Sequence, residues 1–270
     1  MDALVPPRAL SIAGSDSGGG AGIQADLKAF AACGVHGMTA ITAITAQNTV
    51  GVLAVHQIPS AMVVAQVRAV AEDIGVDVVK IGKLGTAETV NAVLEALELL
   101  PSTVPVVVDP VMVSESGAVL LDQAARLSLV SRLLPRATVV TPNVPEARAI
   151  AEMSAAGDAG RYDIEALARA IHSLGPRTVI VTGGHRESAA DVFFDGSTAV
   201  EIPGERFDGA AHGSGCTHSS VLAARLAWGD TPLQAAQEAK RLASLAVANG
   251  LRGIGAGPGP VAVLGSLAQR

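Results

Sequence analysis

Short apolar runs without polar alternation recur along the chain and predict strands that are buried on both faces. These runs lie at residues 9–13, 38–46, 78–81, 104–108, 138–141 and 178–182. Because most successive runs are separated by a segment long enough for a helix, the strands are expected to lie parallel in one sheet.

Between the apolar runs, apolar residues repeat at three- and four-residue intervals, which predicts amphipathic helices. The predicted helices cover residues 23–33, 60–74, 86–100, 122–134 and 163–175. Three of them start at a residue that is typical of a helix N-cap, namely Ser60, Asp122 and Asp163. Alternating buried strands and amphipathic helices favour an α/β fold with helices on both faces of a parallel sheet.

The last third of the chain departs from this alternation. Residues 192–202 are expected to form a hairpin that turns at Asp195-Gly196, a pair that favours tight turns between strands. Two consecutive helices are then expected at residues 216–228 and 232–249.

Composition and charge narrow the class of protein. The chain has 270 residues, of which 49% are hydrophobic and only 16% charged, so it has enough apolar residues to bury a full core. Because the composition does not shift along the chain, residues 1–270 are expected to form one domain. Aromatic residues make up 2% and the net charge is -6, so we expect no nucleic-acid partner. The sequence shows no signal peptide, and no apolar run approaches the roughly 20 residues that a membrane-spanning helix needs. We therefore expect a soluble, cytoplasmic protein without a membrane partner. Two cysteines, Cys33 and Cys216, do not make a disulfide framework.

The segment at residues 211–220 is the most informative part of the sequence. Gly213 and Gly215 allow a tight turn, and the alanine-rich run that follows predicts a helix. Such a helix start directs unpaired N–H groups and the positive end of the helix dipole at one spot, which suits an anion. Cys216 lies beside that spot. An ordinary turn followed by a buried thiol is the alternative, and this segment alone leaves both interpretations open.

Polar or glycine-rich residues follow most of the predicted strands, at the edge of the sheet where ligands of such folds bind. They are the glycine-dense residues 14–22, Gln47-Asn48, Asp109-Pro110-Val111, residues 142–146 and Gly183-Gly184-His185. The first of these is neither a dinucleotide fingerprint nor a P-loop, because no Gly-Lys-Ser/Thr follows it. A single carboxylate at a strand end is usually a helix cap or a surface charge, whereas this many polar strand ends indicate a ligand site.

These segments, in this order and spacing, resemble the hydroxymethylpyrimidine/phosphomethylpyrimidine kinases of thiamine biosynthesis, which belong to the ribokinase-like superfamily. The resemblance extends over about residues 8–260. Its most specific stretches are Ser-Ile-Ala-Gly-Ser-Asp at 11–16, Gly-Ile-Gln-Ala-Asp-Leu-Lys at 22–28, Thr-Ala-Gln-Asn-Thr at 45–49, Asp-Pro-Val-Met at 109–112, Thr-Pro-Asn at 141–143 with Glu146, Gly-Gly-His at 183–185 and His-Gly-Ser-Gly-Cys-Thr at 212–217.

The resemblance implies a ribokinase-like three-layer αβα sandwich with a mostly parallel central sheet. It also implies transfer of the γ-phosphate of ATP to 4-amino-5-hydroxymethyl-2-methylpyrimidine or to its monophosphate. The amides of Gly213, Ser214, Gly215 and Cys216 would form an anion hole for the migrating phosphoryl group. Cys216 stands where related sugar kinases have an aspartate base, and a helix N-terminus could lower its pKa towards neutrality. We expect Cys33 to be a packing residue.

The remaining site residues are also assigned by the resemblance. Gln47 is expected to pair with the aminopyrimidine, because a primary amide both donates and accepts hydrogen bonds. The expected pocket lining is Gly14, Ala21, Thr45, Val111 and Lys83. Asp109 and Glu146 are expected to organise Mg²⁺, largely through its waters. The residues expected near ATP are Asn143, Thr182, Gly184 and Lys240.

The sequence departs from the usual family pattern at three places. Thr182 replaces a lysine that commonly precedes Gly-Gly-His, which removes one phosphate contact. Ser-Glu-Ser-Gly at 114–117 reverses the charge of the usual Ala-Lys-Ser-Gly. Lys83 stands where an uncharged residue commonly lines the pyrimidine pocket, and a poorly solvated ammonium is costly unless it meets an anion. We therefore expect a preference for the monophosphate substrate, unless Lys83 turns to solvent or pairs with Glu115.

Two other functions remain open at this point. Pyridoxal kinase is one, because some relatives with the same cysteine motif phosphorylate pyridoxal. A pyrimidine-binding module without catalysis is the other, although the glycine turn with Asp109 and Glu146 argues against it. The expected partners are a small-molecule substrate and, since dimers are usual among such relatives, a second copy of the chain.

Overall fold

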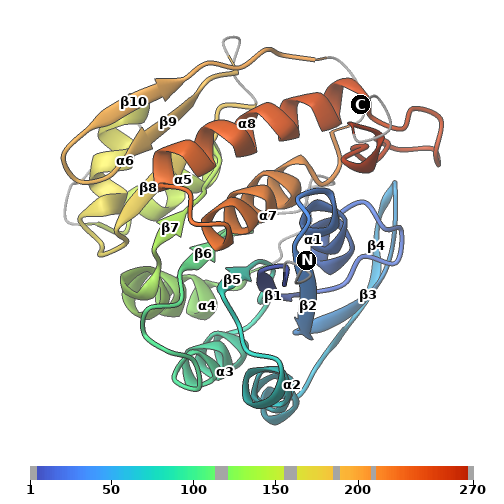
Figure 1. Cartoon of the computed structure of the whole chain (residues 1–270), viewed down its shortest axis with the longest axis vertical. Helices are drawn as coiled ribbons and strands as arrows, with labels where there is room; N and C mark the ends of the chain where they lie inside the picture. The colour runs from blue at the N-terminus through green and yellow to red at the C-terminus, as the bar shows by residue number, and fades with distance from the viewer. Residues whose placement is uncertain (1–4, 113–120, 155–162, 185–188, 208–210, 267–270) are drawn as a thin grey trace.

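An eight-stranded sheet forms the centre of the protein, as a computed structural model of residues 5–112, 121–154, 163–184, 189–207 and 211–266 describes it (Figure 1). Its strand order is β10-β9-β8-β7-β6-β5-β1-β2. The strands are β1 (Arg8–Ala13), β2 (His36–Ile41), β5 (Val78–Ile81), β6 (Val106–Val108), β7 (Val139–Val140), β8 (Thr178–Val181), β9 (Asp191–Phe194) and β10 (Ala199–Ile202). All neighbours pair in parallel except at β9, which is antiparallel to both β8 and β10. The predicted mostly parallel sheet and the hairpin after it are confirmed.

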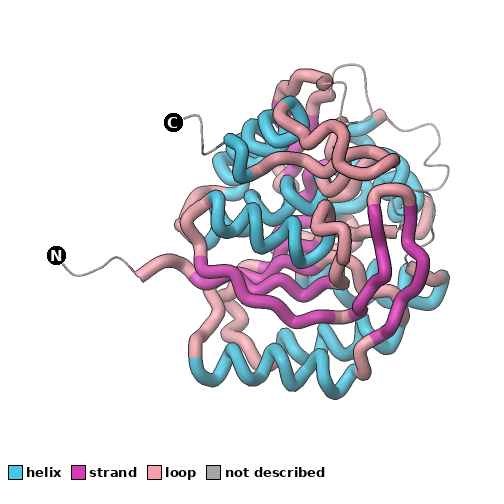
Figure 2. Tube along the Cα trace, turned by 90° about the vertical axis from the view of Figure 1, so that its right-hand side faces the viewer, coloured by secondary structure: helices cyan, strands magenta, loops and turns pink. Residues whose placement is uncertain are grey.

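Helices cover both faces of this sheet. They are α1 (Gly22–Ala32), α2 (Ser60–Asp73), α3 (Ala87–Leu97), α4 (Gln123–Ser128), α5 (Val144–Ala151), α6 (Ile164–His172), α7 (Ser214–Ala227) and α8 (Pro232–Ala248). Along each strand, successive apolar side chains alternate between two cores. For example, Val79 and Ile81 pack in the core of α2 to α6, whereas Val78 packs in the core of α1, α7 and α8. The three-layer αβα sandwich is therefore confirmed, and Figure 2 shows the strands between the two helix layers.

Side-chain caps fix the start of most helices. Asp122 and Asp163 accept hydrogen bonds from the third residue of α4 and α6, as predicted, and these caps satisfy N–H groups that have no partner within the helix. Ser60 is instead the first residue of α2, and Pro59 occupies the cap position. The single helix predicted for residues 122–134 is α4 followed by a π-helical turn at Leu129–Leu133 and a 3-10 turn that contains Pro135.

The strand predicted at residues 38–46 is wrong in extent. It is divided at Thr42 into β2 of the main sheet and β3 (Ala43–Asn48), which pairs with β4 (Gly51–Gln57) in a separate two-stranded sheet. The chain leaves the main sheet at Thr42, whose N–H bonds to Ala13, and returns at Ile58, whose N–H bonds to Thr42. Figure 2 shows this hairpin standing at one end of the main sheet. It places Gln47 above the sheet edge instead of at the end of a central strand.

Within the part of the chain that the structure describes, no helix is both long and apolar enough to cross a membrane.

Candidate active site

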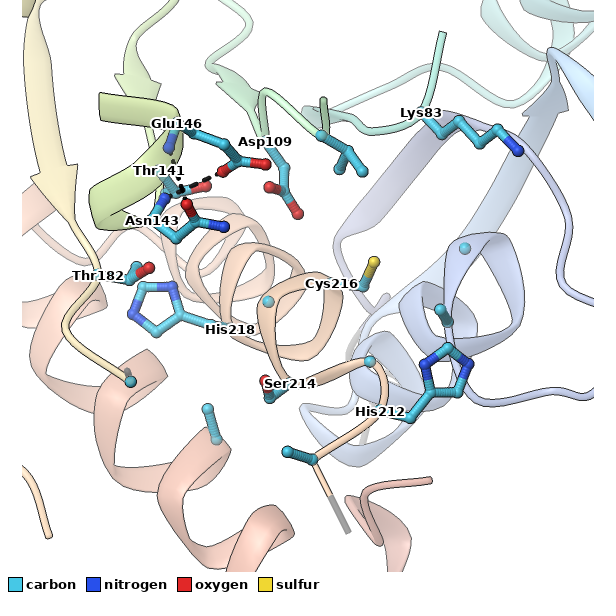
Figure 3. Close-up of a pocket in the computed structure, with 18 of the residues that line it drawn as sticks. Lys83, Asp109, Thr141, Asn143, Glu146, Thr182, His212, Ser214, Cys216 and His218 are labelled. Atoms are coloured by element: carbon cyan, nitrogen blue, oxygen red, sulfur yellow. Dashed lines mark hydrogen bonds between the residues drawn. The ribbon is translucent and has the colours of Figure 1, made fainter. Parts of the chain in front are cut away.

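A cavity of about 850 Å³ opens where the parallel strands end (Figure 3). The segments that follow β1, β5, β6, β7 and β8 all contribute to its wall, and the first turn of α7 closes it from the other helix layer. Of the site residues expected from the sequence, the following line it: Gly14, Ala21, Gln47, Lys83, Asp109, Val111, Asn143, Glu146, Thr182, Gly184, Gly213, Ser214, Gly215 and Cys216. Residues 114–117 and His185 lie outside the described residues.

The glycine turn before α7 forms an anion-binding helix start. Gly213 is the N-cap residue with a φ of 83°, and a Cβ there would lie 1.7 Å from the carbonyl oxygen of Gly20, so only glycine fits. The N–H of Ser214 is already bonded to the carbonyl of Ala211, which corrects the expectation that all four amides face the ligand. The N–H groups of Gly215 and Cys216 lie in the first turn, where no intrahelical acceptor exists. With the N–H of Gly213, they are the donors that the turn can direct at an anion.

The glycine-dense loop after β1 packs directly against this turn. Asp16 is buried, and its carboxylate accepts hydrogen bonds from the N–H groups of Gly18, Gly20 and Ala21. Its Oδ2 atom also lies 3.0 Å from Nε2 of His212. Burial acts to raise the pKa of Asp16, but these partners outweigh it and hold the pKa below its usual value. The density of glycines is thus explained partly by loop packing, since a Cβ at Gly20 would lie 2.2 Å from the His212 ring.

A charged network lies beneath the cavity, between the sheet and helices α1 and α7. Lys80 of β5 is fully buried, and its Nζ atom is 2.9 Å from Oδ1 of Asp26 and 3.9 Å from Oδ2 of Asp109. The hydroxyls of Ser11 and Ser220 donate to the Asp26 carboxylate at 2.6 and 2.7 Å. Burial acts to lower the pKa of Lys80, but the neighbouring acidic groups outweigh it and raise the pKa, so the ammonium stays charged.

Cys216 is placed as expected at the start of α7, but its acidity is not. Burial raises the pKa of this thiol to about 12, and the carboxylates of Asp109 and Asp26 act in the same direction. Lys80 and a hydrogen bond from the N–H of Gly22 oppose the shift without cancelling it. The expected fall towards neutrality is therefore wrong for the ligand-free protein, because the expectation considered only the helix start and not the surrounding carboxylates.

Two buried carboxylates face each other on the opposite wall. Burial raises the pKa of Asp109, whose Oδ2 accepts a hydrogen bond from the Ser219 hydroxyl at 2.9 Å. Burial, followed by the charge of Asp109, raises the pKa of Glu146 to about 8. Since the charge of Asp109 raises the pKa of Glu146, a cation near the two carboxylates would stabilise their ionised forms. The described residues contain no group of three or more His, Cys, Asp or Glu side chains that could hold a metal, so a cation here would keep other ligands.

Asn143 and Glu146 also begin helix α5, which the sequence did not predict. The N–H of Glu146 donates to Oδ1 of Asn143, and the N–H of Asn143 donates to Oε2 of Glu146, which makes a reciprocal capping box. This pairing fixes the Asn143 amide so that its Nδ2 atom is left on the cavity side, where it can donate to a phosphate (Figure 3).

The side of the cavity beneath the β3–β4 hairpin carries the residues expected to bind the substrate ring. Gln47 lies there, with its Oε1 atom 3.3 Å from the Thr45 hydroxyl. Thr45 itself does not line the cavity. Its hydroxyl donates to the Ser15 carbonyl and its N–H donates to the Ser15 hydroxyl, so it joins β3 to the loop after β1. The expectation that Thr45 lines the pocket is corrected accordingly.

Lys83 lies against Gly14 on the same side. Its Nζ atom is buried and has no hydrogen-bond partner among the described residues. Burial lowers the pKa of this ammonium, although the charge of Asp16 opposes the shift. Lys83 is therefore turned into the cavity and not to solvent, while a pairing with Glu115 falls outside the described residues.

Lys240 is not a lining residue, contrary to expectation. Its Nζ atom binds Oδ1 of the buried Asp191 at 2.8 Å, and Oδ1 also accepts the N–H of Gly183. A Cβ at Gly204 would lie 2.2 Å from Cε of Lys240, so the loop after β10 packs closely over this side chain. Lys240 thus holds Asp191, which lines the cavity, and does not itself line the cavity.

The sequence analysis assigned no role to several residues of the site. Lys80 is a lysine within the apolar run Val78–Ile81, and a charge in such a run is a signal for a buried ion pair. Asp26 is the matching signal on the buried face of α1. Asp16, His212, Asp191 and His218 also lie in the wall, and nothing in their local sequence distinguishes them from surface residues.

Comparisons with known proteins identify the family of this chain. The family model described as Phosphomethylpyrimidine kinase matches residues 16–262. The hydroxymethylpyrimidine/phosphomethylpyrimidine kinase of Rhizobium meliloti (strain 1021) is 47% identical over 258 residues, which cover 94% of this chain and 95% of that protein. The structure of the pyridoxal kinase from Staphylococcus aureus in complex with ADP has a TM-score of 0.85 and 33% identity, covering 96% of this chain and 94% of that one. The crystal structure of phosphomethylpyrimidine kinase from Clostridium difficile 630 has a TM-score of 0.74 and 39% sequence identity. The match covers 87% of this chain and 96% of that one.

Proposed function

This chain belongs to the phosphomethylpyrimidine kinase family, and we propose that it transfers the γ-phosphoryl group of ATP to the hydroxymethylpyrimidine precursor of thiamine, preferentially as its monophosphate. One observation carries the proposal. The start of α7 lies between the paired carboxylates Asp109 and Glu146 on one side and the buried ammonium of Lys83 on the other (Figure 3). We further infer that residues 1–270 act as a single kinase domain, because the eight-stranded sheet, its helices and the β3–β4 hairpin contribute to one cavity.

Positioning and charge stabilisation are the main tasks in phosphoryl transfer. In our proposal the N–H groups of Gly213, Gly215 and Cys216 stabilise the charge that develops on the migrating phosphoryl group. Asn143 and Thr182 hold the nucleotide phosphates on the side of α5. Gln47 orients the aminopyrimidine through its amide, and Gly14, Ala21 and Val111 surround the ring.

Cys216 would accept the hydroxyl proton when the free alcohol is the substrate. With a thiol pKa of about 12, the ligand-free protein holds the thiol in its neutral form, so the thiolate must form as the site fills. Lys80 and the N–H of Gly22 already favour the thiolate, and screening of Asp109 would remove a charge that opposes it. The monophosphate needs no such base, because a phosphate monoester is already largely ionised near pH 7.

Asp109 and Glu146 fit Mg²⁺, because both are carboxylates of the cavity wall and the charge of Asp109 raises the pKa of Glu146, so a cation beside them would stabilise their ionised forms. When bound, Mg²⁺ neutralises phosphate charge during transfer. We expect Asp109→Ala or Glu146→Ala to raise the Mg²⁺ concentration for half activity by about 10- to 100-fold, the usual range for residues that hold a metal through its ligands. Mg²⁺ titrations of activity measure this, with Glu72→Ala on the exposed face of α2 as the control. Titration curves that overlay the parent curve would place the metal elsewhere.

Lys83 is the basis for the preferred substrate. An ammonium buried without a partner gains a charge-assisted hydrogen bond when a phosphate enters, of the kind worth about 1.5–3 kcal/mol. We therefore expect kcat/KM for the monophosphate to exceed that for the alcohol by roughly 10- to 100-fold in the parent enzyme. Lys83→Met should abolish most of this ratio, whereas Arg68→Met on the exposed face of α2 should preserve it. Equal efficiency on both substrates in the parent, or an unchanged ratio in Lys83→Met, would contradict the assignment.

The test of the proposed function is an ATP-consumption assay with three acceptors, namely the pyrimidine alcohol, its monophosphate and pyridoxal. Pyridoxal is the second candidate because of the similarity to the Staphylococcus aureus pyridoxal kinase. We expect the order monophosphate, alcohol, pyridoxal in kcat/KM, since Gln47 matches an aminopyrimidine. Turnover of pyridoxal above both pyrimidines would replace the proposed substrate.

We also propose that the protein acts as a homodimer. The β3–β4 hairpin exposes the apolar side chains Ile44, Leu53 and Val55 next to the cavity, with Leu53 77% exposed. A second copy that covers them would remove this surface from water. Light scattering that gives the 27.1 kDa of one chain at micromolar concentration would exclude the dimer.

A further inference from the structure

His218 is a buried polar side chain that the proposed reaction does not use. It lies on α7, one turn beyond the anion-binding helix start, and is only 5% exposed. Its Nδ1 atom has no hydrogen-bond partner within the described residues, and its Nε2 atom lies 3.2 Å from Oδ2 of Asp191. The side chain lines the cavity, and Figure 3 shows the ring beside Thr182 on the side of α5. A buried ring nitrogen without a partner is unfavourable unless a ligand completes its hydrogen bond.

Three charged groups face this ring. Oδ2 of Asp191 on β9 lies 3.2 Å from Nε2, close enough for an ion pair when the ring is protonated. Lys240 on α8 binds the other oxygen of Asp191, and Asp109, which directly follows β6, is near enough for His218 to affect its pKa. Asp191 therefore faces Nε2, while Nδ1 is left without a protein partner in the described structure.

The neighbouring residue supplies the reason for a ligand at this point. Thr182 is uncharged, whereas the resemblance implies a lysine in contact with phosphate at this position. Lys240 does not replace it, because its ammonium is bound to Asp191 and lies outside the cavity lining. His218 is the buried side chain beside Thr182 that can become a cation and donate a hydrogen bond from either ring nitrogen.

We propose that His218 donates a hydrogen bond from its imidazole to a phosphate oxygen of the bound nucleotide and so replaces the cation that is absent at Thr182. The inference rests on the proposed function in that the ligand is ATP. When the ring is protonated, its Nε2–H faces Asp191 and its Nδ1–H is left to donate to the phosphate. The ring would thereby contribute to binding of the triphosphate and not to binding of the adenine or ribose.

The experiment measures nucleotide binding by calorimetry without any acceptor substrate. The ligands are a non-hydrolysable ATP analogue with Mg²⁺ and adenosine, which has the same base and sugar but no phosphate. The variants are His218→Leu, Thr182→Lys and the double variant, with His36→Leu as the control because His36 is exposed at the start of β2. Arg206→Leu tests whether Arg206, a cation on the exposed rim of the cavity, binds the phosphate instead of His218.

We expect His218→Leu to weaken binding of the ATP analogue by about 10- to 100-fold, the range for one charge-assisted hydrogen bond, and to leave adenosine binding within twofold. Thr182→Lys should restore most of the lost affinity in the His218→Leu background. Unchanged binding of the ATP analogue, an equal loss for adenosine, or a loss confined to Arg206→Leu would overturn the inference. If His218→Leu does not fold, His218→Asn is measured in its place against the same outcomes. Since no acceptor is present, these results are independent of whether the pyrimidine is the substrate.

Discussion

Cys216→Ala lowers kcat for the pyrimidine alcohol by at least about 100-fold while the protein keeps its fold, because the variant loses the group that accepts the hydroxyl proton. The monophosphate should lose much less, since its attacking oxygen is already ionised. The Lys80 ammonium and the N–H of Gly22 lie near the thiol and both favour its thiolate form. Steady-state kinetics on the two acceptors, with circular dichroism to confirm folding, measure both effects.

Cys33→Ala is the matched control for this prediction. Cys33 is the other cysteine of the chain, burial raises its pKa to about 11, and it packs against the core of α1, α7 and α8 away from the cavity. Its replacement should leave kcat for both acceptors within about twofold. Turnover of the alcohol by Cys216→Ala at near the parental rate would remove the thiol from the mechanism and leave the anion hole as the main catalytic device.

Lys80→Met lowers the free energy of unfolding by about 3–5 kcal/mol, because it leaves the buried carboxylate of Asp26 without its counter-ion. Both side chains of the Lys80–Asp26 pair are fully buried. The exposed pair Arg8–Asp77, with side chains 36% and 34% exposed, gives the comparison, and Arg8→Met should cost about 1 kcal/mol or less. Urea unfolding of both variants measures the difference.

A second variant separates the ion pair from simple packing at this position. Lys80→Met combined with Asp26→Leu removes both charges, so it should recover most of the stability lost in Lys80→Met alone. A loss in Lys80→Met no larger than in Arg8→Met would contradict the interpretation of Lys80 as the counter-ion of the buried network.

The central sheet could be predicted from the sequence because its strands are short apolar runs with few polar interruptions. The β3–β4 hairpin could not. Its apolar residues are exposed, so they do not mark a core-facing side, and the apolar run at residues 38–46 continues through the point where the chain leaves the sheet. That departure depends on hydrogen bonds of Thr42 to Ala13 and Ile58, which are contacts between distant segments.

The site was predictable where residues follow strand ends, because the topology of a parallel sheet brings those ends together. Fourteen of the sixteen residues named from the sequence line the cavity, whereas Thr45 and Lys240 bind other parts of the wall. The thiol pKa was not predictable, because it depends on burial and on carboxylates brought in by α1 and β6. Lys80 and Asp26 each stand out as a charge among apolar residues, but they are 54 positions apart, so the sequence does not show that they pair.

Direct observation of the product tests the proposed function most directly. The enzyme is incubated with ATP, Mg²⁺ and the pyrimidine monophosphate, and the phosphorus species are followed by ³¹P nuclear magnetic resonance. The account predicts that the substrate phosphate oxygen attacks the γ-phosphorus, so that a new P–O–P linkage on the pyrimidine and one ADP appear in equal amounts. Formation of ADP with inorganic phosphate and no pyrimidine diphosphate, or no consumption of ATP under conditions where pyridoxal is phosphorylated, would contradict it.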